Sequence, residues 1–259
     1  MLKIFTFAHK RPDFIELQLK SFRKYLREDF EFTVFNNAAF DQHPGSRDSI
    51  TKECARLSLN EIKIGRDELL TKSAAQYSVG PVFLSNGMYH NANVACAYPL
   101  CWAWQRISKE SGPICILDSD MFLVEPITLT DYLKEHDLCF VSQAREHIRY
   151  AWNGIILANP HKLEQPETLN WWCGQVDGVP VDVGGQTYRY FIEHPTRIMH
   201  IGPESFYEDP SVDFQPSAYE VLHLGDKTIL HYRSGSNWNH QTPEYHRKKT
   251  AWLLQKVNL

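Results

Sequence analysis

An unbroken apolar run at residues 114–117, Ile-Cys-Ile-Leu, is the feature that most constrains the fold of this chain. A strand that is apolar at every position is typically covered on both faces, as strands of parallel sheets are in α/β proteins. Ser111-Gly112-Pro113 interrupts the chain before the run, and Asp118-Ser119-Asp120 follows it. We therefore expect a central buried strand with two carboxylates at its carboxyl end, the edge of an open α/β sheet where ligands bind.

The first 37 residues predict a strand, a helix and a second strand. Residues 2–7 are mostly apolar, and residues 12–26 place apolar side chains at helical spacing with a proline near the first turn. Residues 30–34 then alternate between apolar and polar side chains and lead into Asn36-Asn37, which is typical of a strand that ends in a turn. This order predicts a βαβ unit, the building block of a parallel sheet.

The rest of the chain continues the same pattern. Helices are predicted at residues 91–108, 188–192 and 243–252, with Pro99 expected to kink or split the first of them, and with Thr242 capping the last. Further strands are expected at residues 61–64, 138–141, 150–158, 197–201 and 228–232. We expect one α/β domain over residues 1–259, with a central, mostly parallel sheet flanked by helices.

The composition argues against several classes of partner. The chain has 27 Lys and Arg against 31 Asp and Glu, so it lacks the basic excess that binding to nucleic acid requires. No apolar stretch approaches the ~18 residues of a membrane span, and the apolar start is too short for a signal peptide. The six cysteines form no C-x-x-C pair, which favours reduced thiols. We therefore expect a soluble, cytoplasmic protein without a transmembrane segment.

Asp118 and Asp120 form the first candidate site. Two carboxylates one residue apart at the end of a strand can bind a hard cation, while a diphosphate supplies further oxygens. A D-x-D triplet is short enough to occur by chance, and the alternative is a solvated turn in which Asp120 caps the following residues. The position of the triplet at the end of a buried strand favours the metal site.

A second candidate site follows the apolar pair Ile229-Leu230. The sequence there reads His-Tyr-Arg-Ser-Gly-Ser-Asn-Trp over residues 231–238. The imidazole of His231 can supply a nitrogen to Mn²⁺, and the amides of a glycine- and serine-containing turn can face a phosphate. Arg233 can neutralise a leaving diphosphate. The alternative is that His231 is a structural residue, as most histidines are.

Two further segments could contact a sugar. Asp182 precedes Gly184-Gly185, which would allow the backbone to approach a sugar closely, and it is the candidate for a catalytic or acceptor-contacting carboxylate. The alternative is a turn in which Asp182 caps the next helix. Trp171-Trp172 could stack on a sugar face, although tryptophan pairs more often pack in a core.

The order of these segments resembles the GT-A glycosyltransferases, the nucleotide-diphospho-sugar transferase superfamily. The resemblance is carried by residues 7–13, 36–37, 114–120, 153–157 and 231–238. The chain is similar in particular to the retaining group of glycogenin and the lipooligosaccharide galactosyltransferases. In that group a D-x-D, a strand containing Asn-Gly and a late H-x-x-G-x-x-K-P-W occur in this order. This chain has one extra residue before Gly235 and carries Asn237-Trp238 where Lys-Pro-Trp would end, so Arg233 is the candidate substitute for the lysine.

The resemblance implies a Rossmann-like GT-A domain with a nucleotide-binding half at residues 1–120 and an acceptor-binding half at residues 121–259. It implies a hexosyltransferase-like enzyme that uses Mn²⁺ or Mg²⁺ to transfer a sugar from a nucleotide-diphosphate sugar, with a UDP-sugar favoured, to a hydroxyl of a glycan or other acceptor. The implied metal ligands are Asp118, Asp120 and His231, and the catalytic candidates are Asp182 and Asp120. The implied nucleotide-sugar contacts are Phe7, Ala8, His9, Arg11, Asn36, Asn91, Asn93, Asp118, Ser119 and Arg233, and the implied acceptor contacts are Asn153, Gly154 and Trp172.

The stereochemistry and the reaction class leave alternatives open. The late segment from His231 favours retention of the sugar's configuration, whereas inversion would require a carboxylate base such as Asp182 or Glu193. A phosphohydrolase with Asp118 as nucleophile and Asp120 as acid/base is a second class, although that class normally places its D-x-D after the first strand. A non-catalytic domain that binds a carbohydrate or nucleotide is a third.

Overall fold

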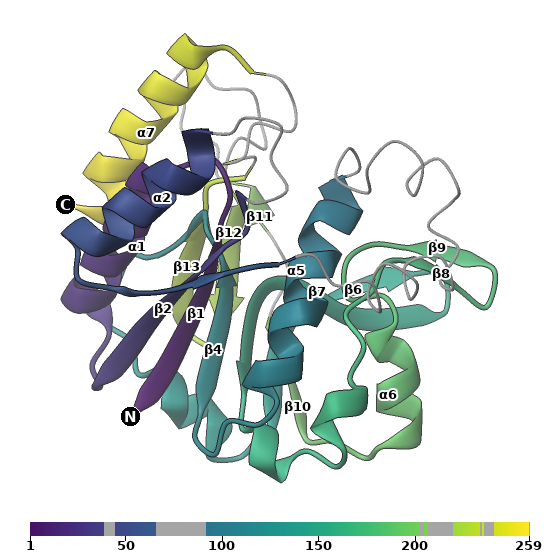
Figure 1. The fold of residues 1–259 in the computed structure, drawn as a ribbon. Helices are drawn as coiled ribbons and strands as arrows, with labels where there is room; N and C mark the ends of the chain where they lie inside the picture. The colour runs from purple at the N-terminus through teal and green to yellow at the C-terminus, as the bar shows by residue number, and fades with distance from the viewer. Residues whose placement is uncertain are drawn as a thin grey trace.

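The computed structural model describes residues 1–38, 45–65, 92–201, 205–206, 220–233, 235 and 241–258. Within these ranges the chain forms a mixed α/β fold around a seven-stranded sheet (Figure 1). The strands in spatial order are β10 (Ile198–Ile201), β6 (Leu138–Arg145), β7 (Ile148–Ala158), β4 (Ile114–Asp118), β1 (Leu2–Ala8), β2 (Phe30–Asn36) and β3 (Asn60–Lys63). Only β7 runs antiparallel to its neighbours in this sheet, so the predicted central, mostly parallel sheet is confirmed.

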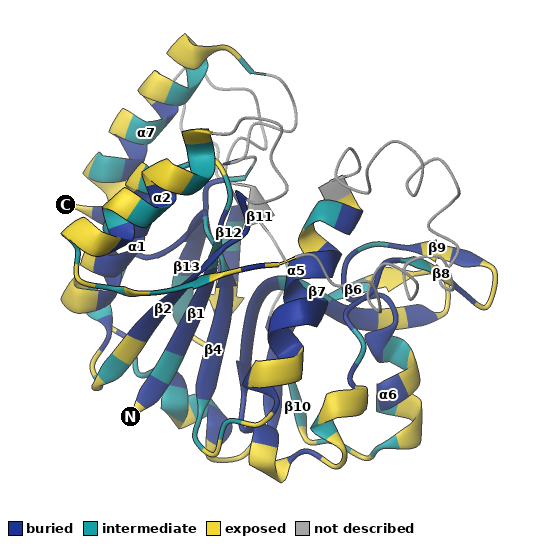
Figure 2. Ribbon diagram, viewed as in Figure 1, coloured by how far each residue is buried: buried dark blue, intermediate teal, exposed yellow. Residues whose placement is uncertain are grey.

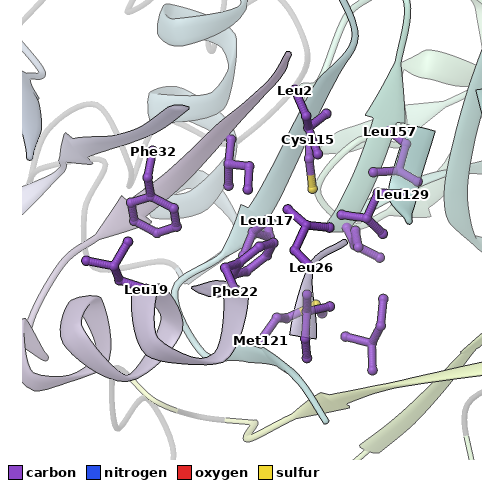
Figure 3. Close-up of a cluster of buried hydrophobic side chains, with 14 of the residues drawn as sticks. Leu2, Leu19, Phe22, Leu26, Phe32, Cys115, Leu117, Met121, Leu129 and Leu157 are labelled. Carbon is purple, nitrogen blue, oxygen red and sulfur yellow. The ribbon is translucent and has the colours of Figure 1, made fainter. Parts of the chain in front are cut away.

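The alternation of side chains along the strands creates a core on each face of the sheet. Ile114 and Ile116 of β4 pack with α5 (Ala92–Ile107), whereas Cys115 and Leu117 pack with residues of α1 (Pro12–Tyr25), α2 (Gly45–Arg56) and the 3₁₀ helix η3 (Leu129–Leu133). Figure 3 shows the second cluster, in which side chains of β4 meet Phe22 of α1. The central strands are accordingly buried along most of their length (Figure 2), as the unbroken apolar run of β4 predicted.

A smaller sheet extends the fold beyond the carboxyl end of β4. Its order is β11 (Ser205–Phe206), β12 (Glu220–Leu224), β13 (Lys227–His231) and β5 (Met121–Leu123). The C-terminal helix α7 (Pro243–Val257) packs on this sheet and on the start of α1. Its N-terminus is capped as predicted, because the hydroxyl of Thr242 accepts a hydrogen bond from the amide of Tyr245 at 3.2 Å.

The remaining elements lie on the other side of the molecule. A short hairpin is formed by β8 (Gly174–Val176) and β9 (Val179–Val181), and it is followed by α6 (Thr187–Glu193). Two 3₁₀ turns, η4 (Pro160–Lys162) and η5 (Pro166–Thr168), precede the hairpin. Among the helices that the structure describes, none combines the length and the apolar character needed to cross a membrane.

The sequence predicted a kink or a split at Pro99, and the split is not observed, because α5 continues through this residue as one helix. The helix buries side chains on both sides of the proline, among them Val94, Tyr98 and Trp104. Packing of this kind contributes more to helix stability in proteins than local propensity does, and it outweighs the ~3 kcal/mol that an internal proline costs. The sequence also did not predict β5, β8, β9, β11 or β12.

Candidate active site

The register of the sheet places the ends of three parallel strands at one edge. Phe7 of β1 pairs with Asp118 of β4, and Ala8 pairs with Asn36 of β2. The chain turns at Ser119 and Asp120 and enters β5, which pairs with β13 so that His231 lies opposite Met121. The predicted carboxylates and the predicted histidine, more than 110 residues apart in the sequence, therefore meet at the carboxyl end of β4.

Asp120 is the centre of this meeting point. One carboxylate oxygen, Oδ1, lies 3.3 Å from Nε2 of His231, and Oδ2 accepts a hydrogen bond from the amide of Gly235 at 2.9 Å. The carbonyl of Asp120 accepts a further bond from the amide of Tyr232 at 2.8 Å. A Cβ at position 235 would come within 2.8 Å of both the Asp120 Cβ and the Phe14 ring. Only glycine permits this approach of the turn to the carboxylate.

Glu220 is a member of the site that the sequence interpretation missed. It is buried on β12, where Oε2 lies 2.7 Å from Nδ1 of His231 and Oε1 lies 2.9 Å from Nε of Arg233. The sequence did carry a signal for it, because Gly225-Asp226 forms a two-residue turn between two apolar runs, with Gly225 at a φ of +64°. That turn sets the register in which Glu220 faces His231.

Asp118 is held by polar groups of neighbouring elements. Its Oδ1 accepts a hydrogen bond from the amide of Ser119 at 3.1 Å, and its Oδ2 accepts one from the side-chain amide of Asn153 on β7 at 3.4 Å. The side chain of Gln18 on α1 donates to the carbonyls of Asp118 and Met121 at 2.7 and 3.0 Å. The buried hydroxyl of Thr6 in turn donates to Gln18, so α1 and β1 fix the backbone of the turn.

The carboxylates and the imidazole change one another's pKa values. Burial, together with the charge of Asp120, raises the pKa of Asp118 to about 7. Burial alone would lower the pKa of His231, but the carboxylates of Asp120 and Glu220 raise it to about 10. Burial alone would raise the pKa of Asp120, but His231 and the Gly235 amide lower it. In this arrangement the imidazolium of His231 supplies the positive charge that Asp120 requires.

The side chains at this position fit a divalent cation by their chemistry. In the parts of the chain that the structure describes, no group of three or more His, Cys, Asp or Glu side chains is placed so that it could hold a metal ion. The 3.3 Å separation of Asp120 Oδ1 and His231 Nε2 nevertheless approaches the ~3 Å between adjacent ligands on an octahedral cation with bonds of about 2.1 Å. Glu220 holds the other ring nitrogen, as carboxylates commonly do for metal-ligating histidines. That Asp118, Asp120 and His231 together hold Mn²⁺ or Mg²⁺ stays a prediction.

Asp182 lies near the same carboxylates. Desolvation, and after it the charges of Asp118, Asp182 and Asp120, raise the pKa of the Cys96 thiol on α5 well above its ordinary value, so the three carboxylates act electrostatically on one residue. Asp182 also has the capping role that was the alternative, because its Oδ1 accepts a hydrogen bond from the amide of Val183 at 2.7 Å. Cys96 is the one exposed cysteine, the other five are buried, and all six are unpaired.

Several of the predicted nucleotide contacts are occupied by other groups. Asn36 departs from the prediction: its side chain is fully buried, donates to the carbonyl of Arg47 and to Glu61, and accepts from the amide of Ala38. Its neighbour Asn37 is also buried, and its Oδ1 has no hydrogen-bond partner in the described structure. The polar group available at the end of β2 is therefore at position 37.

The other residues predicted around the end of β1 divide between the core and α7. Phe7 stacks on Phe35 with ring centroids 5.1 Å apart, and Ala8 is buried, whereas His9 is half-buried. Arg11 lies 3.9 Å from the centre of the Phe14 ring and donates to the hydroxyl of Thr250 on α7. Asn93 is exposed in the first turn of α5, and Asn91 lies outside the described residues.

Of the predicted acceptor contacts, Asn153 and Gly154 lie near the D-x-D turn and His231, whereas Trp172 lies in the core. Asn153 reaches Asp118, and Gly154 leaves room for the ring of Trp152, which would lie 1.9 Å from a Cβ at position 154. That ring packs against His231 with centroids 5.4 Å apart. Trp172 contradicts its predicted role, because the structure buries it in the core, where an acceptor cannot stack on its ring.

Glu193, the alternative base, is not brought to the aspartates. It is exposed at the end of α6, next to residues that pack on the early part of β6. Phe191 stacks there on Phe140, with ring centroids 5.1 Å apart. Of the two carboxylates considered as a base, Asp182 is the one whose charge acts on Cys96 together with those of Asp118 and Asp120.

Comparison with known proteins gives similarities at the level of structure. The sequence matches no family model, and no curated protein matches it. The structure is similar to mouse xyloside xylosyltransferase 1 in its apo form, with a TM-score of 0.43 and 12% identity over 77% of this chain and 84% of that chain. It is also similar to the galactosyltransferase LgtC in complex with donor and acceptor sugar analogues, with a TM-score of 0.47 and 11% identity over 96% of this chain and 100% of that chain. These values describe a likeness, and the functional argument rests on the residues of this chain.

Proposed function

We propose that this chain is a glycosyltransferase that moves a sugar from a nucleotide-diphosphate sugar to an acceptor hydroxyl. The observation that carries the proposal is the convergence of Asp118, Asp120 and His231 at the carboxyl end of β4, beside the turn at Arg233 and Gly235. This edge of an open α/β sheet is where such folds bind nucleotides. We favour a UDP-sugar as donor, a glycan or other hydroxyl compound as acceptor, and a cytoplasmic location.

The chain's own residues account for much of the chemistry that the reaction needs. Asp118, Asp120 and His231 would hold Mn²⁺ or Mg²⁺, which supplies Lewis-acid stabilisation of a leaving diphosphate. Glu220 fixes the imidazole of His231 and the guanidinium of Arg233 at the same time. Arg233 thereby presents a fixed positive charge beside the carboxylates, where charge develops as the glycosidic bond breaks.

Asp182 is the carboxylate that we assign to the sugar side of the site. Its charge acts on Cys96 together with the charges of Asp118 and Asp120, which supports assigning it to a sugar attached to a diphosphate at the D-x-D turn. We favour retention of configuration, in which Asp182 positions the sugar or the acceptor. If the product is inverted, Asp182 is the candidate base, and the configuration of the product by NMR distinguishes the two mechanisms.

The test is release of nucleoside diphosphate from a panel of nucleotide sugars with Mn²⁺, with and without EDTA. We expect turnover of one donor that EDTA abolishes, and Asp118→Asn or Asp120→Asn should lower it by at least about 100-fold, because groups that only orient metal ligands already contribute 10- to 100-fold. Asp131→Asn is the matched control, since Asp131 is exposed on η3 and pairs only with Lys134 in the described structure.

Two results would contradict the proposal. Hydrolysis of a phosphomonoester in place of sugar transfer would identify the chain as a phosphohydrolase that uses the same aspartates. Metal-dependent binding of a nucleotide sugar without turnover, under any acceptor tested, would identify a binding domain.

A further inference from the structure

A lysine occupies a buried position on the C-terminal helix. The inward face of α7 is formed by Lys249, Trp252, Leu253 and Val257, which follow the spacing of an apolar helical stripe. Lys249 is only 1% exposed although its neighbours on this face are apolar. In Figure 2 the buried face of α7 is turned toward the rest of the molecule. A charged side chain in such a stripe needs a specific explanation.

The ammonium of Lys249 contacts the turn that follows β13. Its Nζ donates a hydrogen bond to the carbonyl of Arg233 at 3.0 Å and lies 4.0 Å from the centre of the Tyr232 ring. Arg233 has a φ of +56°, in the left-handed region that is unfavourable for a residue with a side chain. Lys249 therefore holds the backbone of a residue whose conformation needs support from its surroundings.

The conformation of Arg233 decides where two groups of the proposed site lie: the guanidinium proposed to neutralise the diphosphate, and the Gly235 amide that holds Asp120. The side chain of Arg233 is directed to Glu220, and two residues later the amide of Gly235 reaches Asp120. Burial lowers the pKa of Lys249, whereas the carboxylates of Asp120 and Glu220 raise it, so its charge is coupled to the same site. Lys249 thus acts on the site through the position of this turn.

We propose that Lys249 is a positioning residue for the diphosphate of the donor: its hydrogen bond to the carbonyl of Arg233 holds the turn at Arg233 and Gly235 in place. This inference rests on the proposed function. It extends the donor site to α7, which contributes no residue to the cation or to the sugar. Selectivity for a diphosphate over a monophosphate would then depend on a side chain that does not touch the ligand.

The test compares UDP with UMP by calorimetry in the presence of Mn²⁺, with inorganic pyrophosphate as a probe that carries no base. Lys249→Met keeps the length and the apolar packing of the side chain but removes its charge and its hydrogen bond. We expect this variant to bind UDP and pyrophosphate roughly 10- to 100-fold more weakly, the range found for groups that orient ligands, with a much smaller change for UMP. Lys248→Met is the matched control, because Lys248 is exposed on the same helix.

The outcomes separate the two proposals. If the wild-type protein binds UDP tightly and Lys249→Met binds it equally well, the role of Lys249 is wrong and the proposed function stands. If Lys249→Met weakens UDP and UMP by the same factor, Lys249 has only a structural role and the inference is also wrong. If the wild-type protein binds neither UDP nor pyrophosphate with Mn²⁺, the proposed donor site itself is wrong.

Discussion

At the scale of single residues, Glu220 is the group whose replacement tests the site most sharply. Its two oxygens accept from Nδ1 of His231 and from Nε of Arg233, and both partners are proposed to serve the donor. A glutamine has one acceptor oxygen and an NH₂ group, so it cannot accept from both partners. Glu220→Gln should therefore weaken Mn²⁺ binding roughly 10- to 100-fold, measured by titration of the paramagnetic ion.

Glu244→Gln is the control for this prediction, because Glu244 is an exposed residue of α7 whose partners are Arg247 and Lys248. A fall in Mn²⁺ affinity that is equal in the two variants would show that only the overall charge of the chain matters. Unchanged Mn²⁺ affinity in Glu220→Gln would show that His231 does not need this carboxylate in order to bind the cation.

Residue type and position after an apolar run predicted Asp118, Asp120 and His231 as cation ligands, because few side chains bind hard cations, and the structure brings Asp120 and His231 to 3.3 Å. Asn36 shows what residue type cannot provide: the sequence offers two adjacent asparagines, and the strand's alternation directs one of them into hydrogen bonds with Arg47 and Glu61. Which asparagine faces the site depends on the pleat and on α2. Trp172 failed for a similar reason, since a tryptophan suits a core as well as a sugar.

At the scale of elements, the buried Lys249 on α7 leads to a prediction of how the stability of the protein depends on pH. Burial lowers the pKa of Lys249 from 10.5 to about 7, with Asp120 and Glu220 opposing the shift and Arg233 and Arg11 adding to it. Between these two pKa values the unfolded chain binds the proton and the folded chain does not. The free energy of unfolding contributed by this group therefore rises with pH from about 7 to 10.5, and its full cost is present below pH 7.

Lys249→Met lacks this titration, so the wild-type protein should gain about 2–3 kcal/mol relative to the variant between pH 7 and pH 9. Urea unfolding of both proteins at the two pH values measures the difference. The free energy of unfolding of the exposed-site variant Lys248→Met should change between the two pH values by the same amount as that of the wild-type protein. If the free energy of unfolding of Lys249→Met also changes by the same amount as that of the wild type, Lys249 keeps its proton in the folded chain.

Elements with a clear period were predictable, and short ones were not. The helical spacing of residues 12–26 and the apolar run of β4 correspond to α1 and to the centre of the sheet. The strand β12 carries few residues, and its pairing with β13 is fixed by a turn rather than by a long apolar pattern. At Pro99 the sequence predicted a kink or a split, and the split does not occur, because packing on both sides of the proline stabilises one continuous helix.

At the scale of the whole molecule, the sheet crosses the boundary that the sequence suggested between a nucleotide-binding half and an acceptor-binding half. β4 ends at Asp118, yet its neighbours are β1 from the first half and β7 from the second. Ile155 to Ala158 of β7 complete both cores beside β4. The two halves thus share one sheet, and the proposed cation site joins Asp118 and Asp120 of one half to His231 of the other.

A fragment of residues 1–120 should therefore fail to fold alone. It would leave one edge of β4 without its partner and would expose Ile114, Ile116 and Leu117, which β7, β5 and the later helices help to bury. Loss of apolar burial at about 25 cal/mol per Å² over a central strand exceeds the few kcal/mol by which such domains are stable. The fragment should give a poorly dispersed amide NMR spectrum. The full chain should unfold in urea in one transition, with the same midpoint by far-UV circular dichroism and by tryptophan fluorescence. A well-dispersed spectrum for the fragment, or two separate transitions for the full chain, would instead show two independently folding halves that bring the cation ligands together only on docking.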